Sequence, residues 1–236
     1  STVTAIGTSS FKGCSNLTSI HIPGNNTTVG DSAFEFCTNL RQATFANGVI
    51  ELGLTSFAYC TNLLSIAFPP SLMSPGAYTF RQCFALTNVT INAPLTSLPN
   101  GIFQACTSLA NLAIPETVTA IGQSALSGLP VYNLTLPKNL TSIGRKALAN
   151  CFNLSHLIIP ANVTTIESYA FDRSGTPLAL YFMGSRPQSI GATGEILGHR
   201  SPTFYYLAES SGWPLAESEY NEQIWAATVT FDSQGG

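Results

Sequence analysis

The chain has 236 residues, of which 44% are hydrophobic and 9% are charged, and its formal net charge is -3. The hydrophobic share excludes a disordered chain, and the scarcity of Lys and Arg argues against a nucleic-acid-binding protein or a basic membrane-surface patch. Ser and Thr together number 51 and Asn numbers 16, so small neutral polar groups stand where most chains carry charges. Direct insertion into a membrane is not expected either, because no uninterrupted run of about 20 apolar residues occurs.

A repeat of 23 residues organises the chain from its first residues. Cysteines at positions 14, 37, 60, 83 and 106 are each 23 residues apart, and Cys151 keeps the phase after the loss of one residue, with Leu129 in the intervening position. A large apolar residue stands three positions earlier in each repeat: Phe11, Phe34, Phe57, Phe80, Phe103, Leu126, Leu148 and Phe171. A turn column also recurs: Gly7, Gly30, Gly53, Gly76, Pro99, Gly122, Gly144 and Glu167. A fixed period with several agreeing columns is the signature of a repeat architecture.

One segment of each repeat alternates between apolar and polar residues. In the first repeat, Ile20 and Ile22 share one face, Ser19 and His21 share the other, and Pro23 closes the run. This pattern predicts a short strand. The rest of each repeat is too short for a full helix, so we expect a second short strand or extended segment, a glycine turn and one helical or 3₁₀ turn. Units that cannot bury their apolar face alone must stack, and stacked strands pair in parallel at about 4.8 Å per rung.

The pattern Ile-Gly-x-x-Ala-Phe-x-x-Cys-x-x-Leu-x-x-Ile-x-Ile-Pro resembles the BspA-like leucine-rich repeats. Close matches run over residues 6–23, 98–115 and 143–160. The resemblance implies a right-handed leucine-rich-repeat solenoid with a parallel β-sheet on its concave face and short strands and 3₁₀ or helical turns on the convex side. It also implies a secreted or cell-surface protein that binds a partner or mediates adhesion.

The repeat phase divides the chain in two. Residues 1–183 hold eight repeats of about 23 residues, while residues 184–236 are expected to form a degenerate ninth repeat and an aromatic C-terminal cap containing Trp213, Trp225 and a strand over 227–231. Six of the twelve acidic residues lie in this last segment. A cap is expected on physical grounds, because the end of a solenoid exposes apolar core and an unpaired strand edge.

Nothing in the sequence indicates catalysis, a metal or a cofactor. His21 and His156 lie on equivalent strands six rungs apart, which is about 29 Å at the usual strand spacing, and the only other histidine is His199. Metal-ligand spacings such as Cys-x-x-Cys and phosphate-binding glycine motifs are missing from the sequence. The cysteine column permits two interpretations. Neighbouring rungs are close enough for disulfides, but equivalent side chains point the same way, which favours free buried thiols.

The outward strand positions form two stripes of mostly small neutral residues. The larger groups gather toward the C-terminal end, and this predicts a partner-binding patch at His156, Ile158 and Tyr181, because aromatic side chains dominate interface energetics. His21, Thr44 and Thr90 are further candidates on the same face. Eight Asn-x-Ser/Thr sequons are possible glycosylation sites, although the turn and strand pattern of the repeat alone also produces this motif. Their asparagines are Asn16, Asn25, Asn26, Asn88, Asn133, Asn139, Asn153 and Asn162.

Two functions fit these observations. The first is a non-catalytic, extracellular or cell-surface binding or adhesion protein that holds a protein or glycan ligand on its solenoid surface. The second is a self-assembling subunit of an extracellular filament or surface layer, which the low charge favours because little electrostatic repulsion opposes close packing. The sequence also enters the repeat phase at residues 3–7 without a capping segment, and an uncovered coil could pair with another chain.

Overall fold

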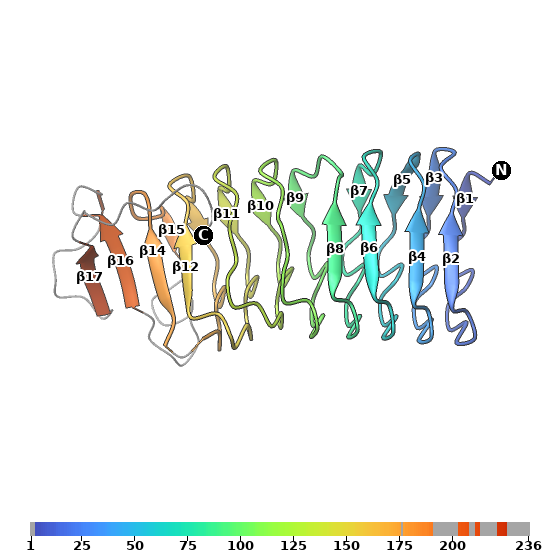
Figure 1. The fold of residues 1–236 in the computed structure, drawn as a ribbon. Coiled ribbons are helices and arrows are strands. Elements are labelled where there is room, and N and C mark those ends of the chain that lie inside the picture. Colours follow the sequence, from blue (N-terminus) through green and yellow to red (C-terminus); the bar gives the residue numbers. More distant parts are fainter. Residues whose placement is uncertain (1–2, 176, 191–202, 208–210, 213–220, 226–236) are drawn as a thin grey trace.

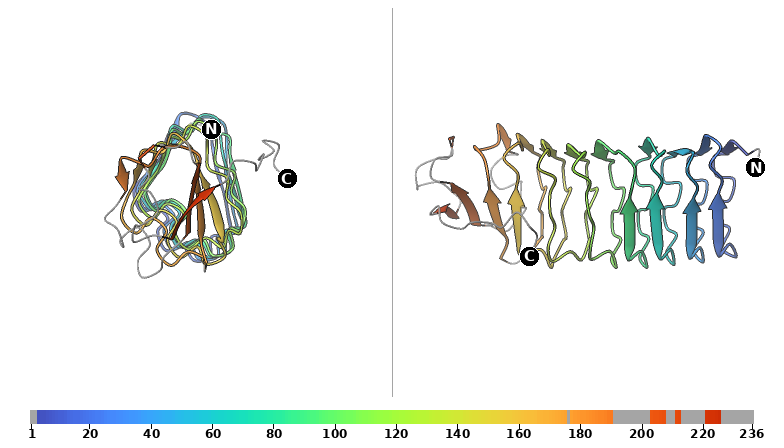
Figure 2. Two further views of the ribbon diagram at one scale, coloured as in Figure 1. Left: turned by 90° about the vertical axis from the view of Figure 1, so that its left-hand side faces the viewer. Right: turned by 45° about the horizontal axis from the view of Figure 1, so that its top comes forward.

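The computed structural model describes residues 3–175, 177–190, 203–207, 211–212 and 221–225. Successive coils stack along one axis into an elongated body (Figure 1), and the coils superpose when viewed down that axis (Figure 2). Every strand pair is parallel, as expected when equivalent segments of successive coils lie side by side. Followed from the N-terminus in Figure 1, the chain winds in the right-handed sense, so the predicted right-handed parallel solenoid is confirmed.

The long strands lie on one side of the solenoid and form two separate sheets. The first, here called the N-terminal long-strand sheet, has the order β2-β4-β6-β8, and the C-terminal long-strand sheet has the order β12-β14-β16-β17. The strands are β2 (Ser19–Ile22), β4 (Gln42–Phe45), β6 (Ser65–Phe68), β8 (Asn88–Ile91), β12 (His156–Ile159), β14 (Ala179–Phe182), β16 (Thr203–Leu207) and β17 (Asn221–Trp225).

Shorter strands form a second side, which confirms the expected second strand of each repeat. They pair in the orders β1-β3-β5-β7 and β9-β10-β11-β13-β15. Their bounds are β1 (Ala5–Ile6), β3 (Thr27–Val29), β5 (Val49–Leu52), β7 (Ser74–Pro75), β9 (Ser97–Leu98), β10 (Ala120–Ile121), β11 (Ser142–Ile143), β13 (Thr165–Ile166) and β15 (Ser189–Ile190).

The third side, here called the turn side, is the arc between each short strand and the next long strand. The expected helical or 3₁₀ turn is not confirmed for the described residues, where this arc consists of consecutive hydrogen-bonded turns. In the second coil the amides of Glu35 and Cys37 donate to carbonyls three residues back, while those of Phe34 and Phe36 donate to the third coil. Positive φ angles of 53° at Ser32 and 62° at Phe36 prevent a continuous helical run. Two of these four amides therefore donate their hydrogen bonds to the neighbouring coil.

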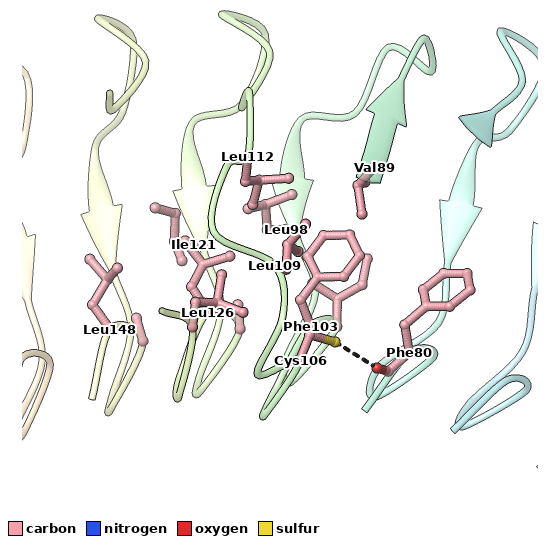
Figure 3. Packing of buried hydrophobic residues seen from close by; sticks show 14 of the residues in the cluster. Phe80, Val89, Leu98, Phe103, Cys106, Leu109, Leu112, Ile121, Leu126 and Leu148 are labelled. Carbon is pink, nitrogen blue, oxygen red and sulfur yellow. Dashed lines mark hydrogen bonds between the residues drawn. The ribbon is translucent and has the colours of Figure 1, made fainter. Parts of the chain in front are cut away.

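Stacked apolar columns fill the interior. The rings of Phe11, Phe34, Phe57, Phe80 and Phe103 stack in series, with neighbouring centroids 5.1, 4.9, 5.6 and 6.1 Å apart. Figure 3 shows Phe80 and Phe103 with the leucine positions that surround and continue the column. Offset-stacked rings pack favourably, and burying large side chains is the main stabilising contribution to such a core.

The glycine column permits the close approach of the coils. A Cβ atom added at Gly53 would lie 2.6 Å from both the Gly30 carbonyl carbon and the Asp31 nitrogen, which no real Cβ atom tolerates. The neighbouring backbones thus pack directly against one another where the short strand ends and the arc begins.

The long-strand side is not one continuous sheet, contrary to the expectation of equivalent strands in all eight repeats. Residues 111–114 and 133–136 occupy the strand positions of the fifth and sixth repeats but form no strand. The sixth repeat is one residue short between Leu129 and Val131, and this shortens the corner before residues 133–136. The pairing resumes at β12.

The solenoid continues beyond residue 183. β16 pairs with β14, with Phe182 opposite Tyr206, and β17 pairs with β16. The pairing places equivalent residues of β14 and β16 24 positions apart, one more than the 23 between those of β12 and β14. Trp225 lies in β17, whereas Trp213 and residues 227–231 of the expected cap lie outside the described residues. The boundary between repeats and cap stays a prediction.

Candidate functional site

The C-terminal long-strand sheet brings together the residues with the largest outward side chains. Parallel pairing places Ile158 of β12 opposite Tyr181 of β14, and Tyr181 opposite Tyr205 of β16. Ile158, Tyr181 and Tyr205 are each partly exposed. His156, also on β12, is exposed and stands two residues before Ile158 on the same face. These four residues are referred to below as the aromatic face.

The two tyrosines of this face form a rigid pair. Their ring centroids are 4.6 Å apart and the ring planes differ by 11°, so the rings stack. Burial raises the pKa of Tyr181, because it disfavours the phenolate, and the neighbouring Tyr205 raises it further because a second negative charge would be repelled. Tyr181 is therefore a neutral phenol at physiological pH.

The other three predicted residues lie elsewhere. His21, Thr44 and Thr90 belong to β2, β4 and β8 of the N-terminal long-strand sheet, where all three are exposed. The Nδ1 atom of His21 is 2.9 Å from the Thr44 hydroxyl oxygen, so these two side chains bond to each other. The fifth and sixth repeats, whose long-strand positions form no strand, separate this sheet from the aromatic face. The six predicted residues thus form two groups.

Tyr205 was missed as a site residue by the sequence analysis. The repeat period points to it only when the additional residue between β14 and β16 is taken into account. The alternation of residues 203–206 contained the signal, because positions 203 and 205 face outward while Phe204 and Tyr206 are buried.

Comparison with protein families identifies the repeat. The model of the BspA type leucine-rich repeat region matches residues 1–110 and 76–192, with six copies. The chain belongs to this family.

Two solved structures share the fold. A leucine-rich repeat protein from Bacteroides ovatus is 21% identical, with a TM-score of 0.61, and the match covers 86% of this chain and 59% of that one. PcpA, described as a pneumococcal vaccine antigen, is 17% identical, with a TM-score of 0.53, and the match covers 97% of this chain and 72% of PcpA. The chain thus spans little more than half the length of the Bacteroides protein. No curated protein matches the sequence.

The cysteine column of the BspA-type repeat consists of free thiols in this chain. Each buried thiol donates a hydrogen bond to a main-chain carbonyl of the preceding coil. Cys106, for example, donates to the Phe80 carbonyl at 3.1 Å (Figure 3). Burial raises the pKa of Cys37 to about 11 and those of Cys106 and Cys151 to about 12. Cys14 differs, because its side chain is exposed. The column is therefore structural, and its buried members are poor nucleophiles.

The eight asparagines of the sequons are all exposed. Three of them also join neighbouring coils, because the side-chain amides of Asn139, Asn153 and Asn162 donate to the carbonyls of Glu116, Pro130 and Lys138. These amides thus have a structural role in the BspA-type repeat, and their glycosylation stays a prediction.

Within the described ranges, no group of three or more His, Cys, Asp or Glu side chains is arranged to hold a metal ion. The same part of the chain contains no helix long and apolar enough to cross a membrane.

Proposed function

We propose that the chain is a non-catalytic binding protein, exposed at a cell surface or secreted, that contacts a protein partner through the aromatic face. The observation that carries this proposal is the stacked pair Tyr181 and Tyr205, partly exposed beside Ile158 on three adjacent strands. Membership of the BspA-type family and the likeness to PcpA, a vaccine antigen, support a protein exposed to partners outside the cell.

The geometry suits an interface because little has to be ordered on binding. Each tyrosine side chain has two rotatable χ angles, and both rings are already held by stacking and by strand pairing. Tyrosine is also among the residues enriched at binding hot spots, where one large side chain supplies apolar contact area and a hydroxyl. The aromatic face contains no Asp, Glu, Lys or Arg side chain, and the Nδ1 atom of its His156 lies 3.2 Å from the Ser155 hydroxyl oxygen.

A solid-phase assay with the purified chain tests this proposal. The probes are a panel of purified extracellular-matrix and serum proteins, coated separately. We expect saturable binding to at least one of them, and a loss of about tenfold or more when Ile158, Tyr181 and Tyr205 are all replaced by Ala, as for hot-spot truncation. A matched control variant, with His21 and Thr44 replaced by Ala, should bind as the unaltered chain does.

Thermal denaturation of each variant shows whether the fold is preserved. Equal binding by the triple variant and the unaltered chain would refute the aromatic face as the contact site, and failure to bind any protein of the panel would refute the protein-binding role. Light scattering across a concentration series addresses the other function expected from the sequence. A monomeric chain supports the partner-binding function. Regular polymers would instead support the self-assembling subunit.

A further inference from the structure

A line of aromatic rings flanked by cations runs along the turn side of the first four coils. Phe36 and Tyr59 stack with ring centroids 4.4 Å apart. The Lys12 ammonium lies 5.9 Å from the centroid of Phe36, and the Arg81 guanidinium carbon lies 5.7 Å from that of Tyr59. Both residues have a positive backbone φ angle of 62°. The line is on a different side of the coil from the aromatic face.

The two ends of this line differ in charge. Lys12 forms an ion pair with Glu35 at 2.8 Å, so that end is neutral. Arg81 forms no ion pair with any residue that the structure describes. Its guanidinium also lies over a second ring, Tyr78, whose centroid is 5.9 Å from the guanidinium carbon. A positive charge thus contacts two aromatic rings and has no acidic partner among the described residues.

Tyr78 extends this arrangement over the fifth coil. A Cβ atom added at Gly101 would lie 2.1 Å from Cδ1 of Tyr78, so the tyrosine ring lies directly across the glycine of the neighbouring coil. The absence of a side chain at position 101 is what gives the ring this place.

Two hydrogen-bonding atoms on the fourth and fifth coils have no partner. Among the described residues, only three buried side-chain nitrogen or oxygen atoms lack one, namely Nε of Arg81, Oε1 of Gln104 and the hydroxyl oxygen of Ser56. Arg81 and Gln104 occupy equivalent positions in consecutive coils, which the bond from the Gln82 amide to the Gln104 carbonyl, 2.8 Å long, holds together. A buried polar atom without a partner costs about 1–3 kcal/mol. A donor and an acceptor in adjacent coils therefore both lack a partner.

We propose that Tyr59, Tyr78, Arg81 and Gln104 form a binding site for an acidic saccharide. A sugar carboxylate would pair with the Arg81 guanidinium, which presents a planar set of donors that matches a carboxylate. A hydroxyl group both donates and accepts, so sugar hydroxyls can satisfy Gln104 Oε1 and Arg81 Nε after a small shift of the covering side chains. The C–H face of a pyranose ring carries partial positive charge and packs against the negative face of the Tyr78 ring.

The far end of the turn side provides a matched comparison. There Arg145 and Lys146 lie over Tyr169, at 5.7 and 5.8 Å from the ring centroid. An acidic group is already present, because the Glu167 carboxylate accepts a hydrogen bond from the Arg145 amide at 2.8 Å. A cation lies over a tyrosine ring both at Arg81 and at Tyr169. Neither Arg145 nor Lys146 is among the described residues with a buried polar side-chain atom that lacks a partner, whereas Arg81 and Gln104 are. A substitution at Lys146 is therefore a control for general loss of positive charge.

Binding to a printed array of sialylated, uronic-acid-containing, sulfated and neutral glycans tests the proposal. We expect the chain to bind carboxylate-bearing glycans and to lose about tenfold or more in affinity on Arg81→Gln, in line with the loss of a charge-assisted bond. Tyr78→Asn should weaken binding similarly, and it keeps a residue that tolerates positive φ. Lys146→Gln should leave binding unchanged.

Two further readouts distinguish the source of any signal. Reducing the glycan carboxylate to an alcohol should weaken binding, and a short peptide of alternating Asp and Glu should not compete. The proposal is overturned if no glycan binds, if Lys146→Gln lowers binding as much as Arg81→Gln does, or if the acidic peptide competes fully. If Tyr78→Asn fails to fold, Arg81→Lys decides, because it keeps the charge but removes the planar donor set. Neither result depends on the protein-binding role of the aromatic face.

Discussion

The thiol of Cys83 donates a hydrogen bond to the main-chain carbonyl of Phe57 in the preceding coil, with 3.3 Å between sulfur and oxygen. The same carbonyl accepts a bond from the Cys60 amide at 3.4 Å. The relationship recurs from Cys37 to Cys106 and at Cys151. Cysteine is thus both a small buried apolar residue and a donor that ties one coil to the next.

Cys83→Ser should destabilise the chain less than Cys83→Ala. A serine hydroxyl can donate to the same carbonyl, and the eighth repeat already does this, because Ser174 takes the cysteine position and its hydroxyl donates to the Leu148 carbonyl. Alanine removes the donor and leaves a small void, which together cost about 1–2 kcal/mol. Urea denaturation measures both variants, and an equal or larger loss for serine would show that the sulfur acts by packing alone.

Alkylation of the folded chain with iodoacetamide at pH 8 should modify one of the six cysteines rapidly, Cys14. Cys14 is exposed, whereas burial raises the pKa of Cys37 to about 11 and that of Cys106 to about 12, so their thiolates are scarce and covered. Intact mass spectrometry counts the added groups. Cys14→Ser should then gain none, and unfolding in urea should expose every thiol. Rapid modification of several cysteines in the folded chain would contradict the buried column.

The chain should lose stability as the pH rises above about 9. A thiol whose pKa is raised in the folded state binds its proton more tightly there than in the unfolded chain, whose value is close to the ordinary 9.0. The resulting stabilisation is complete below pH 9 and is lost as the pH rises through about 12 for Cys106 and Cys151. Denaturation midpoints at pH 8, 9, 10 and 11 measure the slope.

A variant with Cys106 and Cys151 both replaced by Ser is the control for this pH dependence. It has fewer thiols to ionise, so its stability should fall less steeply between pH 9 and 11. Identical slopes for the variant and the unaltered chain would assign the alkaline loss to other groups, such as the tyrosines.

The sequence predicted the elements that depend on a single repeat unit. The phenylalanine column, the cysteine column and the alternation at residues 19–22 follow from burial and strand period alone, and each is found in the structure. The turn side could not be predicted in the same way. The Phe34 amide donates to the Ser56 carbonyl of the next coil rather than within its own coil. This choice depends on the distance between stacked coils, which the local sequence pattern does not specify.

The candidate site was predicted in part for a related reason. Ile158 and Tyr181 follow from the fixed period, and the structure places them on adjacent strands. Tyr205 joins them only through the additional residue before β16, and the contact of Arg81 with two tyrosines depends on side-chain directions from different coils. Small departures from the repeat, rather than the repeat itself, create both proposed sites.

The gap in the long-strand side should be visible in amide hydrogen exchange. Leu112, Leu134 and Val89 occupy equivalent positions and are equally buried, each with 8% of its surface exposed. Val89 lies in β8, whose pairing with β6 includes Ile66 opposite Val89, whereas Leu112 and Leu134 belong to segments that form no strand. Equal burial therefore separates the effect of strand pairing from that of side-chain packing. We expect the amides of Leu112 and Leu134 to exchange faster than that of Val89 by about tenfold or more, because their segments can open without breaking the pairing of a strand. Nuclear magnetic resonance of the folded chain in deuterated buffer resolves the three amides, with Leu157 of β12 as a second protected reference. Equal protection at all four positions would show that the sheet runs unbroken through the fifth and sixth repeats in solution.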